Sequence, residues 1–105
     1  KQNAVVVGGG SGMGEAIALG LAAEGATVVV AGRRLAKLNE VATQADGTIL
    51  THTVDVADRG SVRTLFDWVS ERLGQLHLLV NCAGANVPKR SMSELYAESL
   101  RRRIL

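Results

Sequence analysis

The sequence predicts an α/β fold in which helices cover both faces of a parallel β-sheet. Four short apolar segments alternate with segments whose apolar residues recur at helical spacing, and only a few residues separate one from the next. The predicted strands are mainly apolar or β-branched runs without a two-faced alternation, which is typical of strands buried on both faces and not of strands with one face in water. A glycine-rich loop follows the first of these strands and leads directly into a helix.

The first strand is predicted at residues 5–7, which are three consecutive valines, and the first helix at 13–24. Gly25 follows this helix as its stop signal. A glycine inside a helix costs about 1 kcal/mol relative to alanine, so Gly20 is expected to mark close packing on the sheet. The face predicted to turn inward carries Met13, Ile17, Gly20 and Leu21.

The other strands are predicted at 27–31, 48–54 and 76–80. A second helix is predicted at 35–45, and Asp58 can cap a third helix that ends at a glycine. The apolar faces of these two helices are formed by Leu35, Leu38, Val41, Ala42 and Ala45, and by Val62, Leu65, Phe66, Val69 and Leu73 before Gly74.

The loop at residues 8–14 has the features of a phosphate-binding site. The first amide groups of the following helix have no partner within the helix and lie at the positive end of its dipole. Glycine at position 8 lets the chain turn sharply off the strand. At Gly12 and Gly14, a side chain would hold a pyrophosphate away from the backbone or the helix away from the sheet. The candidate binding residues of the loop are Gly8, Ser11, Gly12, Met13 and Gly14.

This order of elements predicts one half of a Rossmann fold. Right-handed crossovers, with the glycine loop after the first strand, give an expected strand order of 3-2-1-4. Residues 1–105 are therefore predicted to form the N-terminal part of a single Rossmann-type dinucleotide-binding domain.

The end of the second predicted strand indicates which dinucleotide would bind. In a Rossmann half this point faces the adenosine ribose, where an acidic residue would bind the 2′-hydroxyl of NAD. The sequence has Gly32, Arg33 and Arg34 there and no acid. Glycine leaves room, and a guanidinium suits the extra phosphate of NADP, so NADP is favoured over NAD. The alternative is that the two arginines are only the solvated start of a helix.

Composition limits the remaining function classes. The chain has 105 residues, of which 47% are hydrophobic and 21% charged, and no segment approaches the roughly 20 apolar residues of a membrane helix. A net charge of +2 gives no argument for a nucleic-acid partner. Cys82 is the only cysteine, so a reducing, cytoplasmic location is expected. His52 and His77 have no acidic or thiol partner at ligand spacing, which favours structural roles and no metal site.

The glycine spacing resembles that of one family. From Gly8 it is G-x-x-x-G-x-G, which differs from the commonest dinucleotide fingerprint. It resembles the loop of the short-chain dehydrogenase/reductase family, with Val7 where that family usually has threonine. The loss of this hydroxyl removes a group that could stiffen the loop.

Two later motifs extend the resemblance. The Asp-Val pair at 55–56 stands where the family places an acid and an apolar residue against the adenine ring, although this acid could equally well only begin a turn. The run Asn-Cys-Ala-Gly at 81–84 is similar to the family's Asn-Asn-Ala-Gly, whose first residue holds the sheet and whose Ala-Gly backbone lies beside the cofactor. The substituted residue, Cys82, is expected to be a small buried filler. The resemblance adds Asp55, Val56, Asn81, Ala83 and Gly84 to the candidate cofactor-binding residues.

The resemblance implies an NADP(H)-dependent oxidoreductase that reduces a carbonyl or oxidises an alcohol by hydride transfer. Family members use a Ser, a Tyr and a Lys, the last two as Tyr-x-x-x-Lys. The only tyrosine here, Tyr96, is followed four positions later by Leu100, so no catalytic residue is assigned. We therefore expect the cofactor-binding half of a longer enzyme, acting on a small molecule that the sequence does not identify. The alternative is a short polypeptide that binds a nucleotide or a partner chain and catalyses nothing.

The fourth predicted strand, at 76–80, also bears on assembly. Its residues are Leu-His-Leu-Leu-Val, and it has neither the proline nor the inward charge that protects an exposed sheet edge. If this strand is an edge, it is a template for pairing with another chain, so we expect a homo-oligomer.

Overall fold

The computed structural model describes residues 2–8, 10, 12–45 and 48–82. Each element predicted in this part of the chain is present, and the ends differ from the predicted ends by one or two residues. The elements are β1 (Asn3–Val7), α1 (Gly12–Ala23), β2 (Thr27–Gly32), α2 (Leu35–Gln44), β3 (Thr48–Thr53), α3 (Arg59–Leu73) and β4 (Leu78–Asn81). The predicted loop and helix after residue 84 lie outside the described residues.

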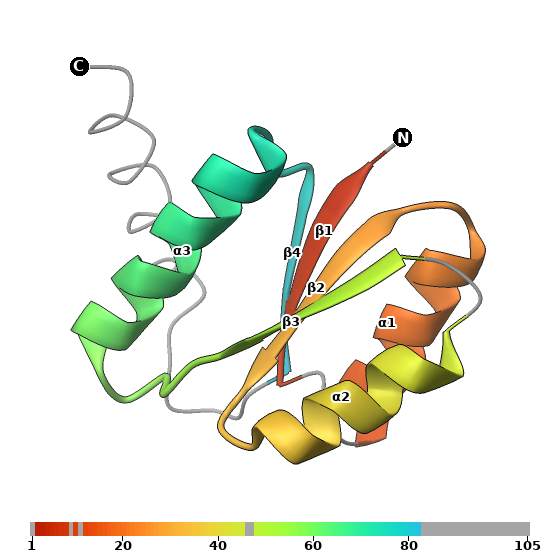
Figure 1. The fold of residues 1–105 in the computed structure, drawn as a ribbon, viewed down its shortest axis with the longest axis horizontal. Helices are drawn as coiled ribbons and strands as arrows, with labels where there is room; N and C mark the ends of the chain where they lie inside the picture. Colours follow the sequence, from red (N-terminus) through yellow and green to blue (C-terminus); the bar gives the residue numbers. More distant parts are fainter. Residues whose placement is uncertain (1, 9, 11, 46–47, 83–105) are drawn as a thin grey trace.

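The strands form one parallel sheet of four strands in the order β3-β2-β1-β4, which confirms the predicted order (Figure 1). Val5 of β1 lies opposite Val29 of β2 and Leu79 of β4, and Val29 lies opposite Leu50 of β3. All four strands are parallel, so their carboxyl ends meet at the same edge of the sheet.

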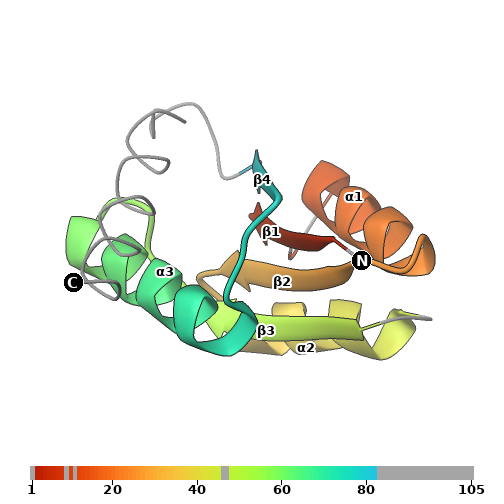
Figure 2. The same cartoon turned by 90° about the horizontal axis from the view of Figure 1, so that it is seen from above.

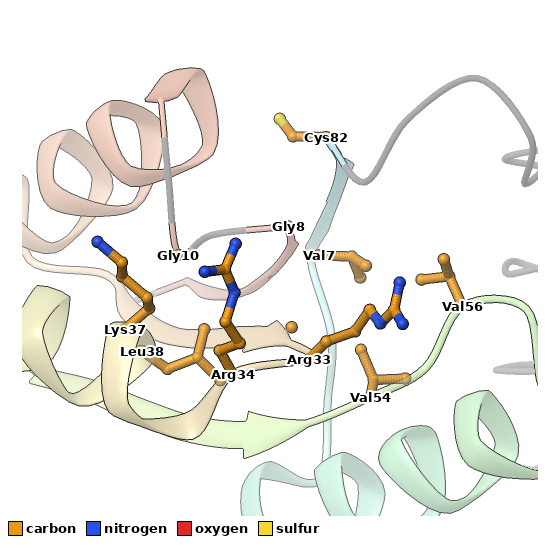
Figure 3. Close-up of a pocket in the computed structure, with 11 residues that line it drawn as sticks. Val7, Gly8, Gly10, Arg33, Arg34, Lys37, Leu38, Val54, Val56 and Cys82 are labelled. Carbon is orange, nitrogen blue, oxygen red and sulfur yellow. The ribbon is translucent and has the colours of Figure 1, made fainter.

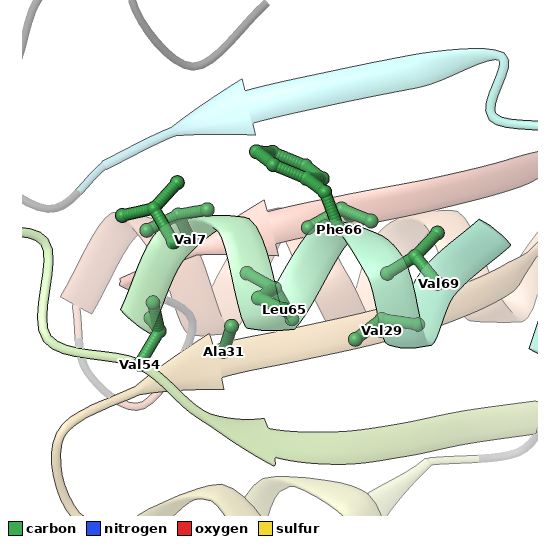
Figure 4. Packing of buried hydrophobic residues seen from close by; sticks show 9 residues of the cluster. Val7, Val29, Ala31, Val54, Leu65, Phe66 and Val69 are labelled. Carbon is green, nitrogen blue, oxygen red and sulfur yellow. The ribbon is translucent and has the colours of Figure 1, made fainter. Parts of the chain in front are cut away.

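Helices cover both faces of the sheet, as the apolar strands predict (Figure 2). On one face, α3 packs Leu65, Phe66 and Val69 against the odd-numbered valines of β1 and β2, and all three side chains are fully buried (Figure 4). On the other face, α1 and α2 pack against Val6, Val28 and Val30. The alternation of side chains along a strand explains why neighbouring valines belong to different cores.

The inward face predicted for α1 is only partly correct: Ile17 and Leu21 are half-buried against the core, but Met13 and Gly20 are not part of that face. The helix buries Gly14, Ala18 and Ala22, whereas the side chain of Met13 is 73% exposed. The space around Gly20 is open, so this glycine does not mark close packing. Small residues at intervals of four lie on one face and let α1 approach the sheet closely. In a helix this rich in apolar residues, the positions of the larger side chains do not reveal that face.

The ends of the helices follow the predicted signals. Oδ1 of Asp58 accepts hydrogen bonds from the amides of Gly60 at 2.9 Å and Ser61 at 3.4 Å, which confirms the predicted cap of α3. Gly74, with φ of 79°, ends α3, and Gly25, with φ of 95°, follows α1. None of the helices in the described ranges has the length and apolar character needed to cross a membrane.

Candidate functional site

A cavity of about 710 Å³ lies at the carboxyl edge of the sheet (Figure 3). The chain runs from β1 to β2 and β3 on one side and then crosses to β4 on the other, so the strand order reverses beside β1. Crevices at such reversals are the usual ligand sites of open parallel sheets. The described residues that line the cavity are Val7, Gly8, Gly10, Gly32, Arg33, Arg34, Lys37, Leu38, Val54, Val56 and Cys82.

The glycine loop forms one wall of this cavity. Gly8 has φ of 83°, a conformation that favours glycine, and its amide donates a 2.7 Å hydrogen bond to the carbonyl of Ala31 at the end of β2. Gly12 has φ of 54°, a conformation that favours glycine. The space where a Cβ would lie is open, so the reason for glycine at this position is the backbone conformation and not crowding. The sharp turn predicted at Gly8 is therefore present. Gly14 is buried within α1.

The start of α2 packs against the loop through contacts that the sequence did not predict. A Cβ on Gly10 would lie 3.4 Å from Cβ of Lys37 and 3.5 Å from Cδ2 of Leu38. A Cβ on Gly32 would lie 3.4 Å from the same Cδ2. The side chain of Leu38 is only 1% exposed, so it forms a buried floor between the glycine loop and the end of β2.

The cationic part of the cavity is formed by Arg33, Arg34 and Lys37. All three side chains are exposed, and no carboxylate occurs among the lining residues. Arg34 is the N-cap residue of α2 and makes no side-chain capping hydrogen bond, and the first turn of the helix contains no acid. Fixed positive charge beside a helix N-terminus favours an anionic ligand.

The end of β3 supplies an apolar wall and a turn. Val54 is buried and Val56 half-buried, and both line the cavity. Asp55 instead builds the turn: its Oδ1 accepts a 3.0 Å hydrogen bond from the amide of Ala57, and its own amide donates at 2.8 Å to Oγ of Ser61. Of the two roles left open for Asp55, the turn is the one for which the structure provides contacts. Asp55 and Arg33 both line a smaller neighbouring cavity of about 260 Å³.

The end of β4 closes the cavity beside β1. Asn81 lies opposite Val7 in the sheet, and the amide of Cys82 donates a 2.8 Å hydrogen bond to the carbonyl of Val7. Cys82 is half-buried and lines the cavity, so it is less buried than the small buried filler that the sequence predicts.

The cavity thus brings together only part of the predicted set: Gly8, Gly32, Arg33, Arg34 and Val56. Gly12, Met13, Gly14, Asp55 and Asn81 are described but do not line it. Ser11, Ala83 and Gly84 lie outside the described residues.

The two histidines lie away from this cavity. Nδ1 of His77 accepts a 2.9 Å hydrogen bond from the amide of Asn3, and the amide of His77 donates to the carbonyl of Asn3 at 2.9 Å. The ring of His52 packs against Trp68 with 4.9 Å between centroids. Both contacts are structural. Within the described ranges, no three histidine, cysteine or acidic side chains come together as metal ligands would.

Comparison with known proteins agrees with this architecture. Residues 2–104 match the family described as short chain dehydrogenase. The short-chain dehydrogenase fogB of Aspergillus ruber is 42% identical over 93 residues, which cover 81% of this chain and 34% of that protein. The chain spans only about a third of the length of such curated relatives.

Two solved structures are similar to almost the whole chain. The citronellol catabolism dehydrogenase AtuB of Pseudomonas aeruginosa PAO1 superposes with a TM-score of 0.77 at 29% identity, covering 97% of this chain and 50% of that one. A metagenomic short-chain oxidoreductase in complex with NADP gives a TM-score of 0.81 at 25% identity, covering 98% and 56%. Strand order, glycine loop and sequence match all point the same way: the chain belongs to the short-chain dehydrogenase/reductase family.

Proposed function

We propose that this chain supplies the cofactor-binding part of an NADP(H)-dependent oxidoreductase that reduces a carbonyl or oxidises an alcohol by hydride transfer. The observation that carries the choice of cofactor is the end of β2, where Gly32 and two arginines line the cavity and no acid is present. An acid at this point would bind the ribose of NAD, whereas a guanidinium would bind the additional phosphate of NADP.

The lining residues fit such a cofactor in kind. Val54 and Val56 would form an apolar wall beside the adenine. Backbone N–H groups of the loop from Gly8 would bind the pyrophosphate, and the guanidinium of Arg33 would bind the 2′-phosphate. When bound, the nicotinamide supplies or accepts the hydride, and these residues hold and orient the rest of the molecule. The related metagenomic oxidoreductase was solved in complex with NADP, which supports the same choice here.

Titration of the purified protein with NADPH and NADH, followed by nicotinamide fluorescence, tests this choice. A charge-assisted contact worth about 1.5–3 kcal/mol should make NADPH bind roughly 10- to 100-fold more tightly. The double change Gly32→Asp with Arg33→Ala should reverse the preference. The new Asp Cβ would lie 3.4 Å from Cδ2 at the end of the Leu38 side chain, a van der Waals contact, so position 32 can accept it. Equal affinities in the unchanged protein would contradict the proposal.

The catalytic groups are part of the same proposal. No Tyr-x-x-x-Lys occurs in the sequence, so we propose that proton transfer uses residues of the enzyme beyond these 105. The 105-residue polypeptide alone should then show no turnover of ketones or secondary alcohols with either cofactor. Turnover that copurifies with it and is lost in Tyr96→Phe would contradict this assignment.

The same missing motif favours a second candidate, a short polypeptide that binds a nucleotide or a partner and catalyses nothing. The intact mass of the protein from its source cells separates the two. A mass of 11.0 kDa favours the second candidate. About 25–28 kDa, a common size for a complete single-domain enzyme, favours the first. A cytoplasmic location and a homo-oligomeric assembly belong to the proposal as well.

A further inference from the structure

The three cations of the cavity do not point in one direction (Figure 3). Arg33 extends toward Val56, whereas Arg34 and Lys37 extend on the side of Gly10. An anion that enters the cavity therefore has cations on two sides. We propose that Lys37 is a further specificity residue, which contacts the 2′-phosphate from the side opposite Arg33. The inference rests on the proposed function, because it assumes that NADP(H) is the ligand.

Packing fixes where the Lys37 side chain begins. Its Cβ lies 3.4 Å from the Cβ position of Gly10, and the next residue, Leu38, is 1% exposed beneath the loop. The base of Lys37 thus lies beside the glycine loop, and its side chain extends on the side of Gly10, where the residue lines the cavity (Figure 3). A lysine presents a compact charge with three donors, which suits a phosphate that a planar guanidinium already contacts from another direction.

The charges around Lys37 point to an anion and not to an internal ion pair. None of the described residues that line the cavity is acidic, and α2 has no acid in its first turn. Glu40 comes three residues later on the same helix but does not line the cavity. Arg34, the N-cap residue of α2, and Lys37, three positions later, both extend on the side of Gly10 (Figure 3). Two like charges held side by side are stabilised by a ligand that carries two negative charges.

The competing explanation is that Lys37 only covers Gly10 with its aliphatic stem. Calorimetric titration of the purified full chain with adenosine 2′,5′-bisphosphate and with AMP distinguishes the two, because these probes differ only in the 2′-phosphate. Lys37→Gln should weaken binding of the bisphosphate about three- to tenfold and leave the Kd of AMP unchanged, the size expected for an exposed charged contact. Lys37→Arg should keep most of the preference.

Arg72→Gln is the matched control, because it also removes one positive charge but lies on α3, where its guanidinium is 5.6 Å from the Trp68 ring. It should leave both Kd values unchanged. Suppose that the unchanged protein binds the bisphosphate more tightly than AMP. If Lys37→Gln keeps this difference, or raises the Kd values of both probes by the same factor, the role of Lys37 is refuted while the preference for NADP stands. If the unchanged protein binds both probes equally, the proposed function fails as well.

Discussion

At the scale of single residues, Leu38 connects the parts of the site. Its Cδ2 lies 3.5 Å from the Cβ position of Gly10 and 3.4 Å from that of Gly32, so one side chain contacts both the glycine loop and the end of β2. Gly10 and Gly32 therefore both lie beside this leucine, and the geometry of the cavity floor depends on it.

Replacing Leu38 with alanine should destabilise the protein and weaken nucleotide binding together. Loss of a fully buried leucine costs about 2–5 kcal/mol of unfolding free energy, because the neighbouring groups only partly fill the space. Leu35→Ala on the same helix is the control: that side chain is 48% exposed and should cost less than about 1 kcal/mol. Urea denaturation measures both variants. Equal losses would show that Leu38 is not the buried floor.

The residues of the site differ in how far the sequence could predict them. Gly8, Gly32 and Arg33 were predictable, because the topology of a Rossmann half specifies what lies after β1 and β2. Lys37 and Leu38 were not assigned, because their roles depend on how the first turn of α2 packs on a loop some 30 residues earlier. A cation in that first turn, after two arginines, was the only local signal.

At the scale of elements, α1 and α3 show when periodicity predicts a face and when it does not. In α3, large apolar side chains alternate with charged ones, and the predicted residues Val62, Leu65, Phe66 and Val69 are all buried. In α1, nearly every residue is small or apolar, so burial is decided by how closely the backbone can approach the sheet. That distance is a tertiary property, and the sequence pattern contained no information about it.

The cap of α3 provides a test at this scale. Asp58→Ala removes the acceptor for the amides of Gly60 and Ser61 and should lower the unfolding free energy by about 1 kcal/mol. Asp58→Asn keeps an acceptor of similar shape and should cost much less. Chemical denaturation of the pair checks this. If asparagine were as harmful as alanine, the charge of Asp58 and not the cap would be responsible.

At the scale of the whole molecule, the amino edge of the sheet holds neighbouring segments together, and the carboxyl edge forms the cavity. At the amino edge, the side-chain amide of Asn3 donates to the carbonyl of Gln75 at 2.9 Å, and the amide of Thr27 donates to the carbonyl of Gln2 at 2.9 Å. These bonds hold neighbouring segments in register. The carboxyl edge carries the cavity, with walls from β1, β2, β3 and β4. The hydrogen bonds at the amino edge can therefore be altered without changing a residue that lines the cavity.

The lateral edge formed by β4 leads to the last prediction. Among the described strands, β4 pairs with β1 alone, and it presents Leu78, which is 37% exposed, and two half-buried apolar residues. Unpaired backbone groups on an apolar strand are a template for another strand. The 105-residue chain on its own should therefore self-associate, and light scattering should show a mass that rises with concentration.

The variant Leu78→Lys identifies the surface responsible. A lysine on an exposed edge position disfavours pairing with a second strand, because its charge would have to be buried or repelled there. The variant should shift the chain toward monomer without loss of folding, since the leucine that it replaces is not part of either buried core. A stable monomer of the unchanged chain, with slow amide exchange at residues 78–80, would mean that this edge is already protected.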